Sequence, residues 1–149
     1  MRVSIGCDHR GLHVKEKLIQ LLGKLGHEVF DEGAHDDQSV DYPDIASAVA
    51  GKVSSGESDR GILVCGTGIG MSIAANKLSG VRAAVCHDEI TAELSRRHND
   101  LNVLCLSGDM LGEQRLDRMV ETWLTTEFEG GRHSRRVDKI SAIEKKPCP

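Results

Sequence analysis

Short apolar runs alternate with longer amphipathic stretches along the whole chain, and this alternation limits the fold more than any other feature of the sequence. Most of the apolar runs are continuous, as expected of strands that are buried on both faces of a sheet. Alternation of such strands with helices is typical of βαβ units on a parallel sheet. We therefore predict an α/β fold, a three-layer Rossmann-like sandwich with a five-stranded parallel sheet. The predicted strands are Val3–Cys7, Glu28–Asp31, Gly61–Cys65, Ala83–Cys86 and Val103–Leu106.

Amphipathic periodicity predicts helices between and after these strands. In the first stretch, apolar residues recur near every 3.6 positions and Gly26 ends the pattern. The other helices are expected at Tyr42–Ser55, directly after the glycine-rich segment that follows Cys65, from Thr91 to His98, along an apolar stripe at 116–124, and at 132–146, a C-terminal basic helix. The 149 residues contain no repeat and no linker, so we expect residues 1–149 to form a single domain.

The charge balance and the scarcity of aromatic residues exclude several classes of partner. The chain has 19 Lys and Arg against 23 Asp and Glu, and its net charge of −4 has the wrong sign for binding a nucleic-acid backbone. Two Phe, one Trp and one Tyr are too few for a base-stacking surface. No apolar run approaches the roughly 20 residues of a membrane span, and no apolar signal core follows Met1. We therefore expect a cytoplasmic protein with no nucleic-acid and no membrane partner.

Three glycines at alternate positions follow the third predicted strand, in the segment Cys65-Gly66-Thr67-Gly68-Ile69-Gly70. Ligands of open α/β sheets bind at the carboxyl ends of strands, and free N–H groups at a helix N-terminus favour an anion. The P-loop and dinucleotide patterns both fail, because Met71 stands where each requires a glycine. The pattern of a serine hydrolase lacks its second glycine, at Ala74. The segment therefore predicts an anion or oxyanion site, and the alternative is a tight turn that packs a helix closely on the sheet.

The five cysteines include no C-x-x-C pair, so we expect reduced thiols rather than disulfides or a metal site. Cys7, Cys86 and Cys105 lie in apolar runs, where cysteine acts as a small buried residue, and Cys148 lies in the C-terminal tail. Cys65 differs because it ends a strand where the glycines begin. A helix N-terminus favours the thiolate form, so Cys65 is a candidate base or nucleophile. The alternative is one more buried cysteine.

Polar residues at other element ends are candidates for the same site. Asp8 and His9 follow the first strand, whose carboxyl end should open onto the same edge of the sheet as the glycine segment. The alternative for Asp8 is to cap the next helix. His98 follows Ile90 and Leu94 at four-residue intervals, so its imidazole is expected on the buried face of a helix, as a catalytic or an interior histidine.

The C-terminal stretch is locally basic, and Arg132, Arg136 and Lys139 share one face of the predicted helix. Guanidinium groups bind the oxygens of a phosphate as a fork, so this face is a candidate phosphate site. The alternative is a solvated basic helix that pairs with acidic surface.

Taken together, these segments resemble the type B ribose-5-phosphate isomerases and their allose- and galactose-6-phosphate isomerase relatives. The resemblance covers nearly the whole chain. It is carried by Gly6-Cys7-Asp8-His9, Asp41-Tyr42-Pro43-Asp44, residues 65–70, Ser72-Ile73-Ala74-Ala75-Asn76-Lys77, Ser95-Arg96-Arg97-His98-Asn99-Asp100 and Glu129-Gly130-Gly131-Arg132-His133. It implies an aldose–ketose isomerase that uses no metal and no cofactor, acts on a small-molecule sugar phosphate, and forms a homodimer or a dimer of dimers with sites between subunits.

The resemblance also implies a role for each candidate residue. Cys65 would move a proton between C1 and C2 of the open-chain sugar with help from Thr67, and Asp8 would handle the proton that passes between O1 and O2. The other implied roles are ring opening by His98, substrate positioning by Asn99, binding of the enediolate oxygen by the amides of Gly66, Gly68, Ile69 and Gly70, and binding of the phosphate by His9, Arg132, His133 and Arg136.

The expected reaction is the interconversion of ribose 5-phosphate and ribulose 5-phosphate. Three alternatives stay open: a hexose 6-phosphate of the allose or galactose type as substrate, a non-catalytic sugar-phosphate sensor, and a nucleotide-binding regulatory domain. Some relatives carry an arginine for the phosphate after the fifth strand, where this chain has Asp109. Either Arg115 or Arg118 compensates, or the site prefers a different sugar. Another branch uses a glutamate base where Met71 stands here, so the resemblance implies the cysteine branch.

Overall fold

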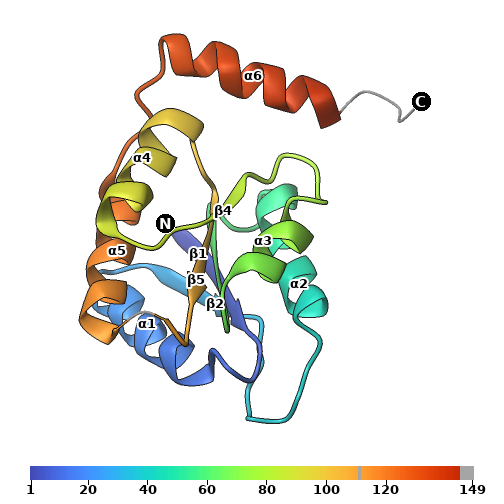
Figure 1. The fold of residues 1–149 in the computed structure, drawn as a ribbon, viewed down its shortest axis with the longest axis vertical. Coiled ribbons are helices and arrows are strands. Elements are labelled where there is room, and N and C mark those ends of the chain that lie inside the picture. Colours follow the sequence, from blue (N-terminus) through green and yellow to red (C-terminus); the bar gives the residue numbers. More distant parts are fainter. Residues whose placement is uncertain (111, 145–149) are drawn as a thin grey trace.

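One parallel sheet lies at the centre of the chain, as the computed structural model of residues 1–110 and 112–144 shows (Figure 1). The strand order is β2-β1-β3-β5-β4, and each neighbouring pair is parallel. The strands are β1 (Arg2–Cys7), β2 (Glu28–Asp31), β3 (Arg60–Cys65), β4 (Ala83–Val85) and β5 (Val103–Ser107). The predicted five-stranded parallel sheet is confirmed, and its strand ends differ from the prediction by one residue at most.

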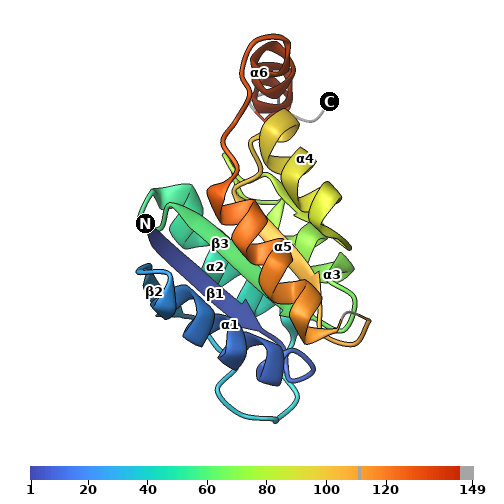
Figure 2. The same ribbon diagram turned by 90° about the vertical axis from the view of Figure 1, so that its left-hand side faces the viewer.

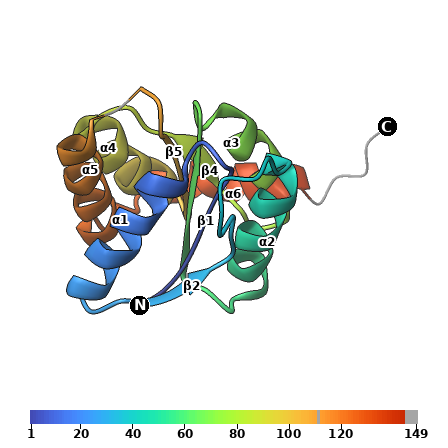
Figure 3. The same cartoon turned by 90° about the horizontal axis from the view of Figure 1, so that it is seen from below.

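Helices cover both faces of this sheet and give the predicted three layers (Figure 3). One face carries α1 (Leu12–Lys24), α4 (Glu89–Asn99) and α5 (Glu113–Thr125), and the other carries α2 (Tyr42–Ser55) and α3 (Ile69–Ala75). A last helix, α6 (Arg132–Glu144), lies across one end of the molecule, next to α4 (Figure 2). Residues 145 and 146, also predicted to be helical, lie outside the described residues, as does Cys148. Within the described ranges, no helix is long and apolar enough to cross a membrane.

Burial separates the central strands from the edge strands. In β1, β3 and β5 nearly every residue is buried, because helices pack against both faces. Ile5, Ile62 and Leu104 face the α1, α4 and α5 layer, whereas Leu63 and Val103 face α2 and α3. β2 and β4 lie at the edges of the sheet and are only partly buried. The continuous apolar runs in the sequence thus mark the strands at the centre.

Four of the described cysteines belong to this core, and one of them, Cys65, ends β3 and is treated with the site below. Cys7, Cys86 and Cys105 are free and buried, as predicted. Burial raises the pKa of Cys7 to about 11 and raises the pKa of the other two thiols above the ordinary value near 9.0. These three thiols are therefore protonated and unreactive near neutral pH.

The two ends of the parallel strands carry different residues, and 'edge' refers from here on to these ends rather than to the outer strands β2 and β4. Because the strands are parallel, Cys7, Cys65 and Ser107 all lie at one edge, which we call the carboxyl edge. Each helix that follows a strand runs back toward the opposite, amino edge. α4 therefore ends at the amino edge, where α6 also lies, far from the carboxyl ends of β1 and β5 (Figure 1). This separation decides which of the predicted site residues meet within one chain.

The start of α4 lies two residues before the predicted position, because Asp88 caps the helix. An Asp88 carboxylate oxygen accepts the N–H of Thr91 at 2.6 Å, and the Thr91 hydroxyl accepts the N–H of Asp88 at 3.2 Å. This reciprocal pair is a capping box, which begins the helix at Glu89.

The expectation that His98 follows a buried face of α4 is wrong for the single chain. Ile90 is 68% exposed and Leu94 is 37% exposed, so the face they share with His98 points away from the core. Ala92 and Arg96 occupy the buried face instead. Arg96 can lie there because its guanidinium pairs with the carboxylate of Asp100 at 2.9 Å and donates to a backbone carbonyl.

Candidate active site

A pocket of about 360 Å³ opens at the carboxyl edge of the sheet, within the usual size range of small-molecule sites. It is lined by the last residue of β3, by residues of the loops after β1, β3 and β5, and by one residue each from α2 and α3. These are Asp8, Arg10, Tyr42, Cys65, Gly66, Thr67, Gly70 and Asp109. The glycine segment and the first strand thus meet in one cavity, as the sequence predicts.

Cys65 lines this pocket at the end of β3. Its side chain is largely buried, with 6% of the residue exposed, and it differs from the other buried cysteines because it lines a cavity. The N–H of Gly68 donates to its sulfur at 3.1 Å. The Thr67 hydroxyl also lines the pocket, but it accepts the N–H of Ile69 at 3.3 Å. The donor on the sulfur is thus the backbone of the glycine segment, an arrangement that suits a negatively charged sulfur.

Two glycines of the segment are required by its geometry. Gly68 has φ of +79°, a conformation that side chains other than glycine rarely adopt, and this turn allows α3 to begin directly after the strand. At Gly70 a Cβ would lie 2.6 Å from ring atoms of Tyr42, so the ring packs directly on the backbone. Both glycines keep the backbone at the pocket wall close to any ligand.

Asp8 faces the same pocket from the end of β1. One carboxylate oxygen accepts the N–H of Arg10 at 2.9 Å and that of Gly11 at 3.2 Å. Gly11, rather than Asp8, is the N-cap residue of α1, so Asp8 holds the loop before the helix instead of capping the helix itself. His9 is half-buried, and its Nδ1 is buried without a hydrogen-bond partner among the described residues. The two amides of Arg10 and Gly11 thus hold one oxygen of Asp8 in place and leave its second oxygen for a ligand.

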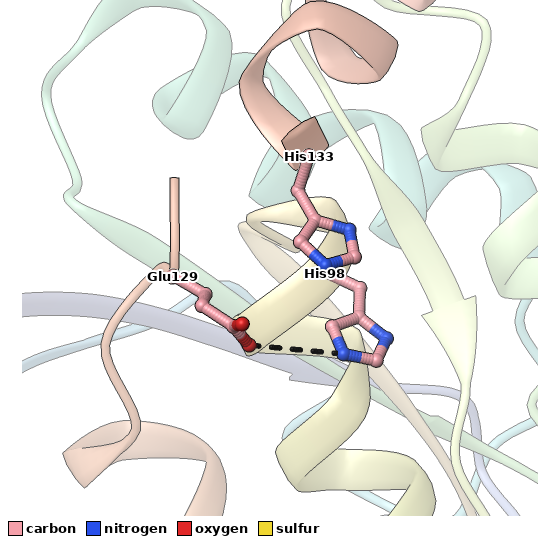
Figure 4. Close-up of side chains that lie close together, drawn as sticks. All are labelled: His98, Glu129 and His133. Atoms are coloured by element: carbon pink, nitrogen blue, oxygen red, sulfur yellow. Dashed lines mark ion pairs between the residues drawn. The ribbon is translucent and has the colours of Figure 1, made fainter. Parts of the chain in front are cut away.

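The remaining predicted residues form a second group at the amino edge. His98 and Asn99 end α4, and Arg132, His133 and Arg136 lie on the first turns of α6. The imidazoles of His98 and His133 stack with their centroids 4.2 Å apart and their planes 5° apart (Figure 4). Within one chain the structure therefore separates this group from Cys65 and Asp8 by the length of the sheet.

Glu129 lies beside the two histidines, and it is a residue to which the sequence prediction assigned no function. Its carboxylate lies 3.9 Å from Nε2 of His98 (Figure 4) and 3.2 Å from the guanidinium of Arg97. His133 is buried, and burial followed by the charge of His98 and Arg132 lowers its pKa below the ordinary value near 6.5. His133 is therefore neutral at neutral pH.

The same three side chains are the group in the described part of the chain that could hold a metal ion. The candidate ligand atoms of His98, Glu129 and His133 all lie within 4.8 Å of one another, and two imidazoles with a carboxylate suit Zn²⁺. However, the in-plane lone pairs of two parallel rings do not converge, so one ring would have to turn to bind an ion. The arrangement favours the histidines as bases or hydrogen-bond donors.

The structure adds three pocket residues that the sequence prediction did not assign. Tyr42 packs on Gly70, and Arg10 pairs with Asp109 across the mouth of the pocket. Arg10 directly follows Asp8 and His9, which was the available signal, whereas the pairing with Asp109 bridges 99 positions of sequence. Arg115, expected as a possible compensating cation, lines a different cavity beside Asp88 and Ile90.

A parallel α/β sheet that presents a thiol, a carboxylate and a glycine-rich helix start in one cavity defines an enzyme that acts on a small molecule. Comparison with known proteins identifies the kind of enzyme. The family described as Ribose/Galactose Isomerase matches residues 3–140. The chain belongs to this family and is an aldose–ketose isomerase, which confirms the resemblance found in the sequence.

Several relatives match over nearly their full length. Ribose-5-phosphate isomerase B of Escherichia coli is 46% identical over 97% of this chain and 97% of its own length. The structure of Clostridium thermocellum ribose-5-phosphate isomerase B has a TM-score of 0.96 and 52% identity, and the match covers 97% of this chain and 98% of that one. Ribose-5-phosphate isomerase B of Mycoplasma genitalium, solved with bound ribulose-5-phosphate, has a TM-score of 0.95 and 43% identity over 98% and 97% of the two chains.

Proposed function

We propose that this chain interconverts ribose 5-phosphate and ribulose 5-phosphate, with Cys65 as the base that moves the carbon-bound proton. One observation carries the proposal: the thiol that ends β3 shares a cavity with Asp8 and the glycine segment. The names of the relatives, and the ribulose-5-phosphate bound to one of them, support the choice of a pentose phosphate. A thiolate is a suitable base for this step near neutral pH.

The reaction transfers two protons. The thiolate of Cys65 takes the proton from C2 of the open-chain aldose and returns it to C1, which restores the thiolate in each turnover. Asp8 moves the second proton from O2 to O1, so that the enediolate intermediate becomes the ketose. One oxygen of Asp8 is engaged by the amides of Arg10 and Gly11, which leaves the other oxygen for this transfer.

The negative charge of the enediolate is stabilised by the glycine segment. The amides of Gly68 and Ile69 already donate to the sulfur and to the Thr67 hydroxyl. We therefore assign the oxyanion to the amides of Gly66, Thr67 and Gly70, next to the start of α3. One such donor contributes roughly 2.7–4 kcal/mol to transition-state stabilisation in comparable sites, so these three amides would account for a major part of catalysis.

The second group of residues reaches the pocket from another copy of the chain. A two-fold axis perpendicular to the strands would place the amino edge of each copy beside the carboxyl edge of the other. A dimer of this kind would have two equivalent shared sites. In this arrangement His98 opens the furanose ring and Asn99 positions the sugar. Arg132, His133 and Arg136 bind the phosphate together with His9 of the pocket's own chain.

Exposed apolar residues on α3 and α4 support this assembly. Ile69 and Ile73 are more than half exposed on α3, as is Ile90 on α4, and Leu94 is also exposed. α3 begins at the glycine segment and α4 ends at His98. Packing α3 of one copy against α4 of another therefore buries these side chains and brings His98 toward the second copy's glycine segment.

The proposed activity is tested by following ketose formation from ribose 5-phosphate, allose 6-phosphate and galactose 6-phosphate. Cys65→Ala should lower kcat on ribose 5-phosphate by about 10²–10⁴-fold, the usual contribution of a general base, with little change in KM. Cys148→Ser serves as the control for loss of a thiol and should be fully active. Substantial activity of Cys65→Ala would remove the base, and faster turnover of a hexose phosphate would change the substrate. Binding without turnover by the unaltered protein would instead indicate a sensor.

Sharing of the site between copies has a separate test. Cys65→Ala and His98→Asn should each be inactive with ribose 5-phosphate. Mixing the two variants under conditions that exchange subunits should restore about a quarter of the normal activity, because half of the dimers then contain one intact site of two. No recovery, despite exchange shown by mass spectrometry, would place both residues in the same chain's site.

A further inference from the structure

Arg10 and Asp109 meet at the mouth of the pocket, over the first peptide of the glycine segment. Nε of Arg10 donates to an oxygen of Asp109 at 2.8 Å, and its Nη2 contacts the same oxygen. A Cβ added to Gly66 would lie 3.0 Å from both the Nε of Arg10 and the oxygen of Asp109. We propose that Arg10 binds the phosphate of the substrate and that Asp109 positions the Arg10 side chain for this task. This inference rests on the proposed sugar-phosphate substrate.

The sheet topology explains why these two residues meet there. β1 and β5 are the two neighbours of β3 in the sheet. Arg10 lies in the loop after β1 and Asp109 in the loop after β5, so their side chains reach across the end of β3 from both sides. The pair therefore lies one residue beyond Cys65, at the rim of the cavity that holds the thiol.

Charge in the pocket identifies Arg10 as the group that an anionic ligand needs. Of the pocket-lining residues in the described part of the chain, Arg10 alone carries positive charge, and Asp8 and Asp109 carry negative charge. The Arg10 side chain is 59% exposed, so its guanidinium lies in the solvent-filled mouth rather than in the core. Among the described residues that line the pocket, Arg10 is therefore the side chain whose charge can attract a phosphate.

The ion pair leaves Arg10 free to bind a second acceptor. A guanidinium has five N–H donors, and the contact with Asp109 directs only Nε and Nη2 at one oxygen. Exposed ion pairs contribute little to stability, so a phosphate dianion can displace the carboxylate or bind the free side of the guanidinium. Asp109 meanwhile holds the long, flexible side chain of Arg10 over Gly66, which lowers the entropy that Arg10 loses when it binds a phosphate.

An alternative is that the pair is only one more surface ion pair, and the chain supplies a matched control. Arg2 and Asp59 form a pair of similar exposure, with the guanidinium 2.7 Å from the carboxylate, at the opposite end of β1. Arg2→Ala removes an exposed arginine from an aspartate in the same way, outside the pocket. The two variants should therefore differ in their affinity for phosphate only if Arg10 binds the ligand.

The test measures KM for ribose 5-phosphate and inhibition by inorganic phosphate. Arg10→Ala should raise KM and the phosphate inhibition constant by about 10- to 100-fold, the loss expected for a charged hydrogen bond, with kcat within a few-fold of normal. Arg10→Lys should recover part of the loss, and Arg2→Ala should leave both constants unchanged. Asp109→Asn keeps an oxygen for Arg10 but removes the repulsive charge, so it should lower the inhibition constant about threefold.

Each outcome bears on a different claim. Equal values for Arg10→Ala and Arg2→Ala, in a protein that isomerises ribose 5-phosphate, would overturn the role of Arg10 and leave the proposed function intact. If the unaltered protein shows no isomerase activity, binding of inorganic phosphate measured by calorimetry still tests Arg10. Binding lost in Arg10→Ala but kept in Arg2→Ala would then support the phosphate site, and binding kept in both variants would overturn it.

Discussion

Replacement of Gly68 by alanine tests whether the backbone of the glycine segment must keep its shape for catalysis. Gly68 has φ of +79°, and its amide donates to the sulfur of Cys65. A Cβ at this position would lie 3.2 Å from the carbonyl oxygen of Leu106 and 3.2 Å from a methyl group of Val85. The contact atom of Leu106 belongs to the backbone of β5 and is held by the sheet, so the glycine segment itself must shift.

Gly26 provides a control with the same backbone conformation. Its φ is also +79°, and nothing lies within 4 Å of an added Cβ. Alanine in this conformation costs about 1–2 kcal/mol, offset by roughly 0.4–1 kcal/mol because alanine restricts the unfolded chain. Gly68→Ala should lose a further 1–3 kcal/mol, roughly, from crowding against the strand. The difference between the two variants therefore isolates the contact with β5.

Urea unfolding and steady-state kinetics together give the answer. Gly26→Ala should keep normal kcat and KM for ribose 5-phosphate. Gly68→Ala should remain folded but lose about 10- to 100-fold in kcat, because small displacements of catalytic groups have effects of this size. If the two variants are equally stable, the contact with Leu106 is not as described. If folded Gly68→Ala keeps kcat within threefold, the geometry of the segment does not limit the reaction.

Three further predictions concern the core, the thiols and the metal candidate. Lys15 is 1% exposed and donates to Asp31 and to a backbone carbonyl, each at 2.6 Å, so Asp31→Ala should destabilise the fold by about 3–5 kcal/mol in urea unfolding, whereas Lys15→Met should cost clearly less. Equal losses would contradict this. In Cys148→Ser protein at pH 8, iodoacetamide should modify Cys65 alone, in step with loss of activity, because burial raises the pKa of the three core thiols. Peptide mapping that finds a core thiol modified in the folded protein would refute it. Dialysis against a chelator should leave kcat/KM unchanged, and a loss that Zn²⁺ restores would instead assign an ion to the group of His98, Glu129 and His133.

The central strands β1, β3 and β5 could be predicted accurately because a strand that is buried on both faces appears in the sequence as a short apolar run. The order of the strands in the sheet could not be predicted from the sequence. It places β3 between β1 and β5, and this depends on the packing of segments that lie far apart in the chain. The pocket was predictable in part, since parallel strands must place Asp8 and Cys65 at the same edge. The buried face of α4 was not predictable in this way, because hydrophobic periodicity assigns it to Ile90 and Leu94, whereas in the structure Arg96 lies on it. Arg96 is tolerated there through local partners that periodicity does not register.

The charge of the pocket explains why the residues of the proposed site would be divided between two copies. Within one chain, the described residues that line the cavity supply two carboxylates and one guanidinium, that of Arg10, and a thiolate at Cys65 would add a further negative charge. A dianionic sugar phosphate would be repelled by such a cavity. Arg132 and Arg136 would reverse the balance, but their own chain holds them at the opposite edge of the sheet. On the proposed assembly these cations reach the cavity only when two copies pair, so phosphate binding, and with it isomerisation, should be lost when the copies separate.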